Sequence, residues 1–186
     1  PCVLRIANHP YSSLKYYNNS INFFIKINIK KIFYRFASGI ICNSKSSTIF
    51  FKNIFKKKII NIYNPIKIDL SKAKNKKVKN NIISVGRLQN QKNFSGLIKS
   101  FSLVVKYLKN TKLIIIGSGG ELKDLKDLTV RLGLSNKIEF IKYQNADKQI
   151  KSSKLFVLNS LWEGLPNILI EAQMLKTPIL STNCLS

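Results

Sequence analysis

The second half of the sequence alternates short, mostly apolar runs, of which 112–116 is the most continuous, with longer segments of helical periodicity. The apolar runs occupy residues 82–85, 112–116, 138–141, 155–158 and 178–181. Strands that lack polar alternation are typical of a parallel sheet covered on both faces. The intervening segments have the length of crossover helices, at about 94–107, 121–132 and 166–175. This alternation predicts an α/β fold with a Rossmann-like, doubly wound parallel sheet.

The first part of the sequence predicts a smaller α/β layer. Its candidate strands are 2–6, 39–44 and 59–65. Residues 44–55 form a candidate helix, which Ser44 or Ser46 would cap at its N-terminus. Strands and helices in this order are expected of the closing part of an α/β domain.

A lysine-rich stretch with few apolar residues, 67–81, separates the two parts. We therefore expect the tail of an N-terminal domain at 1–66, a linker at 67–81, and a larger domain at 82–186. No internal repeat is visible in the sequence.

Residues 20–36 combine apolar and basic side chains with helical spacing. The apolar residues that can share one face are Ile21, Phe24, Ile25, Ile32, Phe33 and Phe36. The basic residues elsewhere in the segment are Lys26, Lys30, Lys31 and Arg35. Such a helix suits an anionic membrane surface. It also suits ordinary packing in a lysine-rich protein, which is the plainer interpretation, and the sequence leaves both open.

The chain is strongly basic, with 32 basic and 8 acidic residues and a formal net charge of +24. This balance favours anionic partners such as nucleic acids, acidic membranes or phosphorylated small molecules. However, lysine is spread along nearly the whole chain together with asparagine and isoleucine, as an AT-rich coding sequence would produce. We therefore expect no nucleic acid partner.

The cysteines and the single histidine show no metal-ligand spacing. Cys2, Cys42 and Cys184 are interpreted as reduced thiols of a cytoplasmic protein. His9 follows a predicted strand and is either a loop residue or a substrate contact. No apolar run approaches the roughly 20 residues that span a bilayer.

The loop at 86–93 follows one predicted strand and precedes a helix. It contains Gly86, Arg87 and Lys92, which together can form a diphosphate site or an ordinary basic surface. The turn at 117–120 resembles half of a dinucleotide fingerprint, but Leu122 stands where the third glycine would be. A nicotinamide-dependent oxidoreductase is therefore poorly supported.

Two carboxylates follow the predicted strand at 155–158. Glu163 lies in a loop that contains glycine and proline, and Glu171 lies one to two turns into the next helix. Both can face the edge where open α/β sheets bind ligands. Taken alone, the pair could also be ordinary surface residues.

Together these segments resemble the retaining glycosyltransferases of family 4, which have the GT-B fold. The similarity rests on Ser-Val-Gly-Arg-Leu at 84–88, on Leu-Ile-Ile-Ile-Gly-Ser-Gly at 113–119, and on the run from Asn159 to Ala172. Residues 62–66 also resemble the family's approach to its donor domain. Each motif is weak alone, but their order and spacing match across roughly 80–184.

The resemblance implies that the second part binds a nucleotide-diphosphate sugar. Arg87 and Lys92 would neutralise the donor diphosphate as it leaves, and Glu163 would face the sugar hydroxyls, so these three residues would be catalytic. Glu171 would hold the ribose hydroxyls, and Ile141 would lie near the base. The remaining donor-binding residues would be Gly86, Gly164, Leu165 and Asn167.

The resemblance also implies a reaction and its partners. A sugar would move with retention from a donor, expected to be UDP-linked, to a cell-envelope or lipid-linked saccharide. No metal or cofactor is expected, because Arg87 and Lys92 would take over the charge role of Mg²⁺. The protein would be cytoplasmic, with peripheral contact at the inner face of the membrane if residues 20–36 bind lipid.

The chain departs from the family pattern in its length. The family's N-terminal domain has about 150 residues, and the sequence begins without methionine and stops at Ser186. We therefore expect a chain truncated at both ends. A non-catalytic, nucleotide-sugar-binding fragment is the first alternative, and a basic nucleic-acid-binding domain is the second.

Overall fold

The computed structural model describes residues 2–6, 20–66, 78–108, 110–143 and 146–184. His9 and most of the predicted linker, 67–77, lie outside these residues. The chain divides into two compact units. The first comprises Pro1–Pro65 with Trp162–Pro166 and Cys184–Ser186, and the second comprises Ile66–Leu161 with Asn167–Asn183.

The second unit is built on a five-stranded sheet with the order β6-β5-β4-β7-β8, in which every pair is parallel. The strands are β4 (Lys79–Val85), β5 (Lys112–Ile116), β6 (Ile138–Ile141), β7 (Ser153–Leu158) and β8 (Ile179–Ser181). The doubly wound parallel sheet predicted from the apolar runs is confirmed.

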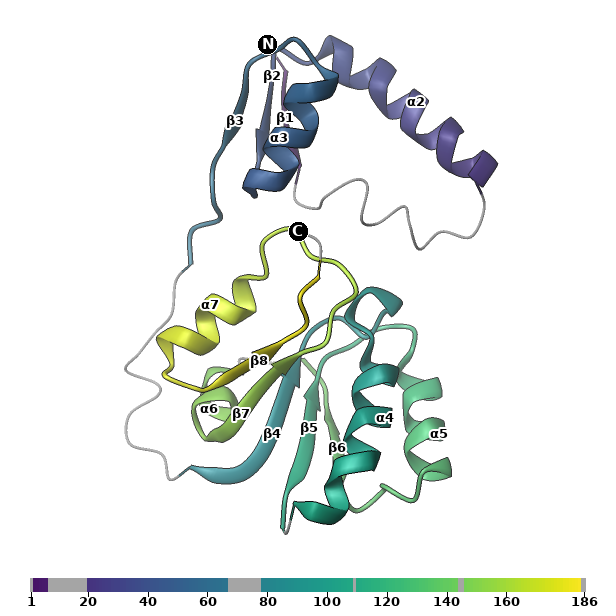
Figure 1. Ribbon diagram of the computed structural model, residues 1–186, viewed down its shortest axis with the longest axis vertical. Coiled ribbons are helices and arrows are strands. Elements are labelled where there is room, and N and C mark those ends of the chain that lie inside the picture. The colour runs from purple at the N-terminus through teal and green to yellow at the C-terminus, as the bar shows by residue number, and fades with distance from the viewer. Residues whose placement is uncertain (1, 7–19, 67–77, 109, 144–145, 185–186) are drawn as a thin grey trace. The chain divides into compact units, whose positions relative to one another are not determined.

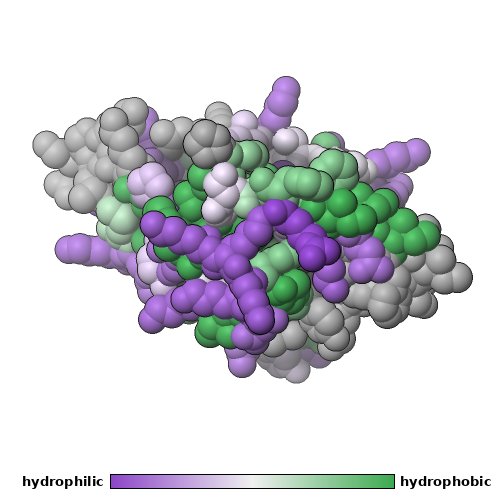
Figure 2. All heavy atoms as spheres, turned by 90° about the horizontal axis from the view of Figure 1, so that it is seen from above, coloured by the Kyte–Doolittle hydropathy of each residue, from purple (hydrophilic) through white to green (hydrophobic). Residues whose placement is uncertain are grey.

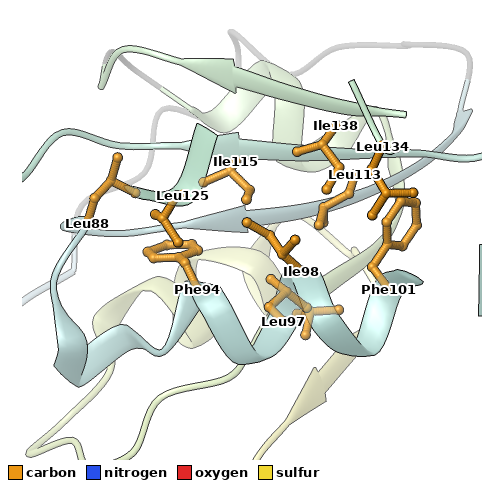
Figure 3. Close-up of a cluster of buried hydrophobic side chains, with 11 residues drawn as sticks. Leu88, Phe94, Leu97, Ile98, Phe101, Leu113, Ile115, Leu125, Leu134 and Ile138 are labelled. Atoms are coloured by element: carbon orange, nitrogen blue, oxygen red, sulfur yellow. The ribbon is translucent and has the colours of Figure 1, made fainter. Parts of the chain in front are cut away.

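Helices cover both faces of this sheet (Figure 1). They are α4 (Phe94–Val104), α5 (Leu122–Arg131), α6 (Asp147–Lys151) and α7 (Asn167–Met174), with 3₁₀ turns η2 (Asn90–Lys92) and η3 (Val105–Tyr107) on either side of α4. Figure 3 shows the core on the α4 and α5 side, where Phe94 and Ile98 pack against Leu113 and Ile115 of β5. The opposite core joins Ile114 and Ile116 to α6 and α7.

The alternation along β5 explains why this strand is continuously apolar. Leu113 and Ile115 face one core while Ile114 and Ile116 face the other, and all four side chains are buried. Burying one such side chain contributes roughly 1.5–3 kcal/mol. A polar residue at any of these positions would therefore be placed inside a core.

Several element boundaries differ from the prediction, three of them by three residues or more. β4 begins at Lys79, so the last three residues of the predicted linker belong to the sheet, where Lys79 pairs with Ser153 of β7. The helix predicted at 94–107 ends as α4 at Val104 and continues as the 3₁₀ turn η3. β3 (Ile59–Asn61) stops before residue 65, because its partner β2 ends at Cys42, opposite Asn61.

The first unit contains a three-stranded parallel sheet with the order β1-β2-β3. Its other elements are β1 (Val3–Ile6), β2 (Gly39–Cys42), α2 (Ser20–Phe36) and α3 (Lys45–Ile54). Ser44 is the N-cap of α3, and its hydroxyl accepts a hydrogen bond from the Ser47 N–H, as predicted. Phe51 of α3 is buried against Ile40 and Ile59 in the core of this unit.

The C-terminal end of α2 is anchored in the first unit. The Tyr34 ring packs edge-on against Phe51, with ring centroids 5.7 Å apart. The Lys57 ammonium donates hydrogen bonds to the carbonyl oxygens of Ala37 (2.7 Å), Tyr34 (3.4 Å) and Arg35. A cation at the C-terminal end of a helix satisfies its last carbonyls and its dipole. None of the described helices is long and apolar enough to cross a membrane.

Candidate functional site

The strand order of the second unit contains a topological switch point. From β4 the chain moves outward through β5 to β6, and it then crosses back to β7, which pairs with the other side of β4. The segments that leave the carboxyl ends of β4 and β7 continue into α4 and α7, which cover opposite faces of the sheet. Open α/β sheets bind ligands at such a point.

The loop after β4 is hydrogen-bonded to the loop after β5. The Gly86 N–H donates to the Ile116 carbonyl (3.0 Å), and the Leu88 N–H donates to the Ser118 carbonyl (2.9 Å). The Glu121 N–H donates in turn to the Leu88 carbonyl (3.2 Å), and the Leu88 side chain is buried in the core. The backbone beside Arg87 is therefore fixed on both sides.

The glycines at 117 and 119 permit this close approach of the two loops. A Cβ on Gly117 would lie 2.0 Å from the Gly86 carbonyl oxygen, and one on Gly119 would lie 2.3 Å from that of Leu88. In contrast, a Cβ on Gly120 would have no neighbour within 4 Å. The glycine-rich turn thus fits the loop after β4, which explains its resemblance to half of a dinucleotide fingerprint.

Two cations and a helix start lie in the loop after β4. Arg87 is exposed, whereas Lys92, the last residue of η2, is half-buried. A Cβ added to Gly86 would lie 3.3 Å from Lys92 Cε, so the aliphatic stem of Lys92 lies over the Gly86 backbone. Asn93 then caps α4 by accepting a hydrogen bond from the Gly96 N–H (3.2 Å). Two basic side chains beside a helix N-terminus are groups that can bind a phosphate.

The loop after β7 is joined directly to the loop after β4. The Leu161 N–H donates to the Gln91 carbonyl (2.8 Å), and the Asn159 side-chain amide donates to the Asn93 carbonyl (3.1 Å). Thr182, which follows β8, donates through its hydroxyl to the Ser160 carbonyl (2.7 Å). The structure thus brings together two segments that lie about 70 residues apart in the sequence.

Glu163 lies between β7 and α7, two residues after Leu161. Glu163 is buried, with 6% of its surface exposed, and the next residue, Gly164, is also buried. Leu165 and Asn167 are half-buried, and Asn167 is the first residue of α7. A carboxylate is rarely buried in proteins unless it has partners.

Glu171 is half-buried in α7. Burial raises the pKa of its carboxyl group above the ordinary value, and the nearby Asp147 carboxylate at the start of α6 raises it further. A carboxyl group with a perturbed pKa at a ligand-binding edge is a candidate functional residue.

Ile141 stands apart from the other predicted site residues. It is the last residue of β6, and β5 separates β6 from β4 along the same edge of the sheet. Its carbonyl accepts a hydrogen bond from the Gly117 N–H (2.9 Å), so its backbone is held by the glycine-rich turn. Within the described part of the chain, no group of three or more His, Cys, Asp and Glu side chains could hold a metal ion.

The sequence prediction missed Asn93 and Asn159. Asn93 could have been recognised, because an asparagine before an apolar helical segment is a common N-cap. Asn159 carries no local signal, since its partner lies 66 positions earlier in the chain.

Comparison with known proteins identifies the family. The model of the family described as glycosyl transferases group 1 matches residues 66–186. An uncharacterized glycosyltransferase of Methanocaldococcus jannaschii is 36% identical over 197 residues, which cover 98% of this chain and 48% of the relative. A lipopolysaccharide core biosynthesis glycosyltransferase, LpsD of Rhizobium meliloti, is 36% identical over 91 residues, which cover 48% of this chain and 25% of that protein.

A solved structure shows the same fold. The pneumococcal O-GlcNAc transferase GtfA, in complex with UDP and GlcNAc, superposes with a TM-score of 0.81 at 15% identity over 99% of this chain and 38% of that protein. The chain therefore spans about half the length of the Methanocaldococcus jannaschii relative and 38% of the length of GtfA. The fold is that of the GT-B glycosyltransferases. Because the family model covers more than half of its residues, the chain belongs to the glycosyl transferases group 1 family.

Proposed function

We propose that this chain binds a nucleotide-diphosphate sugar and serves as the donor half of a retaining glycosyltransferase of family 4. One observation carries this proposal: the loop that holds Arg87 and Lys92 is hydrogen-bonded to the loop that leads to Glu163. A diphosphate and the sugar attached to it need cations and a hydroxyl-binding carboxylate in this order along one edge.

Arg87 and Lys92 bind the diphosphate. Arg87 grips two phosphate oxygens with its planar guanidinium group, and Lys92 supplies a point charge. Gly86 allows close approach of the phosphate to the backbone, and the N–H groups at the start of α4 add positive potential. Because the loop is fixed by hydrogen bonds on both sides, these cations need little rearrangement when the leaving group gains charge.

The acidic residues bind the hydroxyl groups of the donor. Glu163 accepts hydrogen bonds from the sugar, while the backbone N–H groups of Gly164, Leu165 and Asn167 surround the sugar and the phosphate. Glu171 accepts hydrogen bonds from the ribose, and Ile141 lies near the base. A carboxylate can accept two hydroxyl hydrogen bonds at once, which suits the neighbouring hydroxyls of a sugar ring.

The reaction proceeds by front-face attack with retention of configuration. The acceptor hydroxyl oxygen forms the new bond to the anomeric carbon, and the bond from that carbon to the diphosphate oxygen breaks. The hydroxyl proton passes to the departing phosphate, which keeps the electron pair of the broken bond. Arg87 and Lys92 stabilise the charge that develops there, so no metal ion is required.

The relatives support the choice of donor and acceptor classes. GtfA is solved with UDP and GlcNAc, and LpsD acts in lipopolysaccharide core biosynthesis. We therefore propose a UDP-linked donor and a cell-envelope or lipid-linked saccharide acceptor. A cytoplasmic protein at the inner face of the membrane would meet both.

UDP binding, measured by isothermal titration calorimetry, tests this proposal. Arg87→Ala and Lys92→Ala should each weaken UDP binding by roughly tenfold to a hundredfold, since a hydrogen bond to a charged group contributes about 1.5–3 kcal/mol. Lys112→Ala and Arg131→Ala are charge-matched controls, because these exposed cations lie at the start of β5 and the end of α5. If all four variants bound UDP with the affinity of the wild type, and bound GDP likewise, the donor site would be refuted.

Sugar transfer separates the enzyme from its alternatives. A chain that binds UDP and also hydrolyses or transfers the sugar of a UDP-linked donor is a glycosyltransferase. A chain that binds UDP without turnover, even with saccharide acceptors, is a non-catalytic nucleotide-sugar-binding fragment. A chain that binds DNA with a steep salt dependence, and not UDP, is a nucleic-acid-binding protein.

We also propose that α2 contacts an anionic membrane. Its described large apolar residues are 48–79% exposed, and they are Ile25, Ile29, Ile32, Phe33 and Phe36. Their spacing of three and four places them on one face, opposite Tyr34, which packs on α3. Figure 2 shows hydrophobic side chains at the surface beside long hydrophilic ones. The segment 20–36 has four basic residues and no acidic one, which complements anionic lipid headgroups.

Sedimentation with lipid vesicles tests this contact. We expect the protein to bind vesicles that contain phosphatidylglycerol and to bind pure phosphatidylcholine weakly. Phe33→Ser with Phe36→Ser should abolish binding, whereas Leu103→Ser with Tyr107→Ser, which changes equally exposed residues outside α2, should not. Dimerisation that depends on Phe33 and Phe36, without vesicle binding, would show that a second copy covers this face.

A further inference from the structure

We propose that Asn159 is a positioning residue, which holds the Lys92–Asn93 turn in place so that Lys92 can act on the donor diphosphate. Asn159 is the first residue after β7, and Lys92 lies in the loop after β4. This inference rests on the proposed function for the role of Lys92, but the contact between the two loops does not depend on it.

The turn that follows Lys92 has an unusual backbone conformation. Asn93 has φ 49° and ψ 44°, in the left-handed region, which residues other than glycine adopt uncommonly and asparagine adopts when its short side chain bonds locally. A residue persists in this conformation only when several contacts determine it. The direction in which Lys92 leaves the backbone therefore depends on the contacts of Asn93.

Three kinds of contact hold Asn93. Its N–H donates to the Asn90 carbonyl (3.0 Å), and its side chain caps α4 through the Gly96 N–H (3.2 Å). Its carbonyl accepts two hydrogen bonds, one from the Leu97 N–H (3.2 Å) and one from the Asn159 amide (3.1 Å). The first two contacts and the Leu97 bond are local to the turn and α4. Of these four bonds to Asn93, the one from Asn159 comes from the loop after β7, which also binds the neighbouring Gln91 carbonyl through the Leu161 N–H.

Asn159 is itself held in place. The residues on either side of Asn159 are buried: Leu158, which ends β7, and Ser160. The Ser160 carbonyl accepts the hydrogen bond from Thr182, and the Leu161 N–H donates to Gln91. The asparagine side chain is thus presented from a rigid strand end to a strained turn. Such an arrangement orients a neighbouring functional side chain.

A role through Lys92 makes a specific prediction for double mutants. Asn159→Ala should weaken UDP binding by roughly threefold to tenfold, the effect of one lost hydrogen bond. If Asn159 acts through Lys92, the same substitution in a Lys92→Met background should change UDP affinity by less than about twofold. A general loss of stability would instead weaken both backgrounds equally.

Asn80→Ala is the matched control. The Asn80 amide also donates a hydrogen bond, to the Thr111 hydroxyl (2.9 Å). Asn80 lies near the start of β4, at the amino end of the strands, away from the loops after β4 and β7. This variant should bind UDP as the wild type does. Asn159→Leu keeps the approximate volume of the side chain without its N–H donors, and it should bind UDP as weakly as Asn159→Ala.

Hydrogen exchange of the unliganded protein tests the contact without any ligand. Amide protons in the peptide that spans 89–97 should exchange faster in Asn159→Ala than in the wild type and in Asn80→Ala. Unchanged exchange, additive effects of Asn159→Ala and Lys92→Met, or normal UDP binding by Asn159→Leu would each overturn the proposal. Faster exchange in a protein whose wild type binds no UDP would refute the donor function and leave Asn159 as the residue that holds this turn.

Discussion

Gly117→Ala tests the fit between the loops after β4 and β5. The added Cβ would lie 2.0 Å from the Gly86 carbonyl oxygen, whereas real Cβ atoms essentially never approach below 3.0 Å. The Gly86 peptide, or that of Gly117, must therefore move by about 1 Å. Two buried hydrogen bonds hold this region, from Gly86 N–H to Ile116 and from Gly117 N–H to Ile141.

The expected cost follows from these contacts. Overpacking of a close-packed site costs roughly 1–3 kcal/mol, and weakening one or two buried backbone hydrogen bonds adds about 1 kcal/mol each. We therefore expect Gly117→Ala to lower the free energy of unfolding by about 2–5 kcal/mol. UDP binding should also weaken, because a shift of the Gly86 peptide also moves the next residue, Arg87.

Urea denaturation of Gly117→Ala, Gly120→Ala and the wild type provides the measurement. Gly120 belongs to the same turn, but a Cβ there would have no neighbour within 4 Å. Gly120→Ala should therefore remain within about 0.5 kcal/mol of the wild type, as surface substitutions usually do. If Gly117→Ala were as stable as Gly120→Ala, the close approach of the two loops would be refuted.

Two further predictions concern Glu171 and Lys57. Because the Glu171 pKa is raised above 4.5, its ionised form should disappear at a higher pH than that of an ordinary glutamate as the pH falls. UDP binding should weaken correspondingly, and Asp147→Asn should shift this loss to lower pH in titrations followed by calorimetry; an unshifted profile would exclude the influence of Asp147. The raised pKa also means that the stability contribution of Glu171 is present below pH 4.5 and is lost as the pH rises through the raised value, so Glu171→Gln should raise the free energy of unfolding at pH 7. Lys57→Met should lower the stability of the first unit by about 1–2 kcal/mol, because the carbonyls at the end of α2 lose their donor. Exchange of the α2 amides measures this effect, and Lys56→Met, which changes an exposed neighbouring lysine, should leave it unchanged.

The sequence by itself determined most strands and helices of this fold and the residue types that stand in its loops. A continuous apolar run such as 113–116, bounded by polar residues and glycine, favours a strand covered on both faces, because each of its side chains avoids water. Ser44 before a helical segment predicted its own role as an N-cap, since capping depends on residues only three positions away. The family followed from the order of the motifs. These features are local, so the residue types and their spacing suffice to predict them.

Only the tertiary structure decided which of these features meet. The crossing from β6 back to β7 sets the loop after β7 against the loop after β4, and nothing in the local sequence specifies which edge of β4 is joined. The bond from Asn159 to Asn93, the fit of Gly117 beneath Gly86, and the exposure of the apolar face of α2 all depend on segments distant in the sequence. Such contacts arise from the packing of whole elements. The hydrophobic periodicity of a segment predicts its secondary structure but not which other segment it will contact.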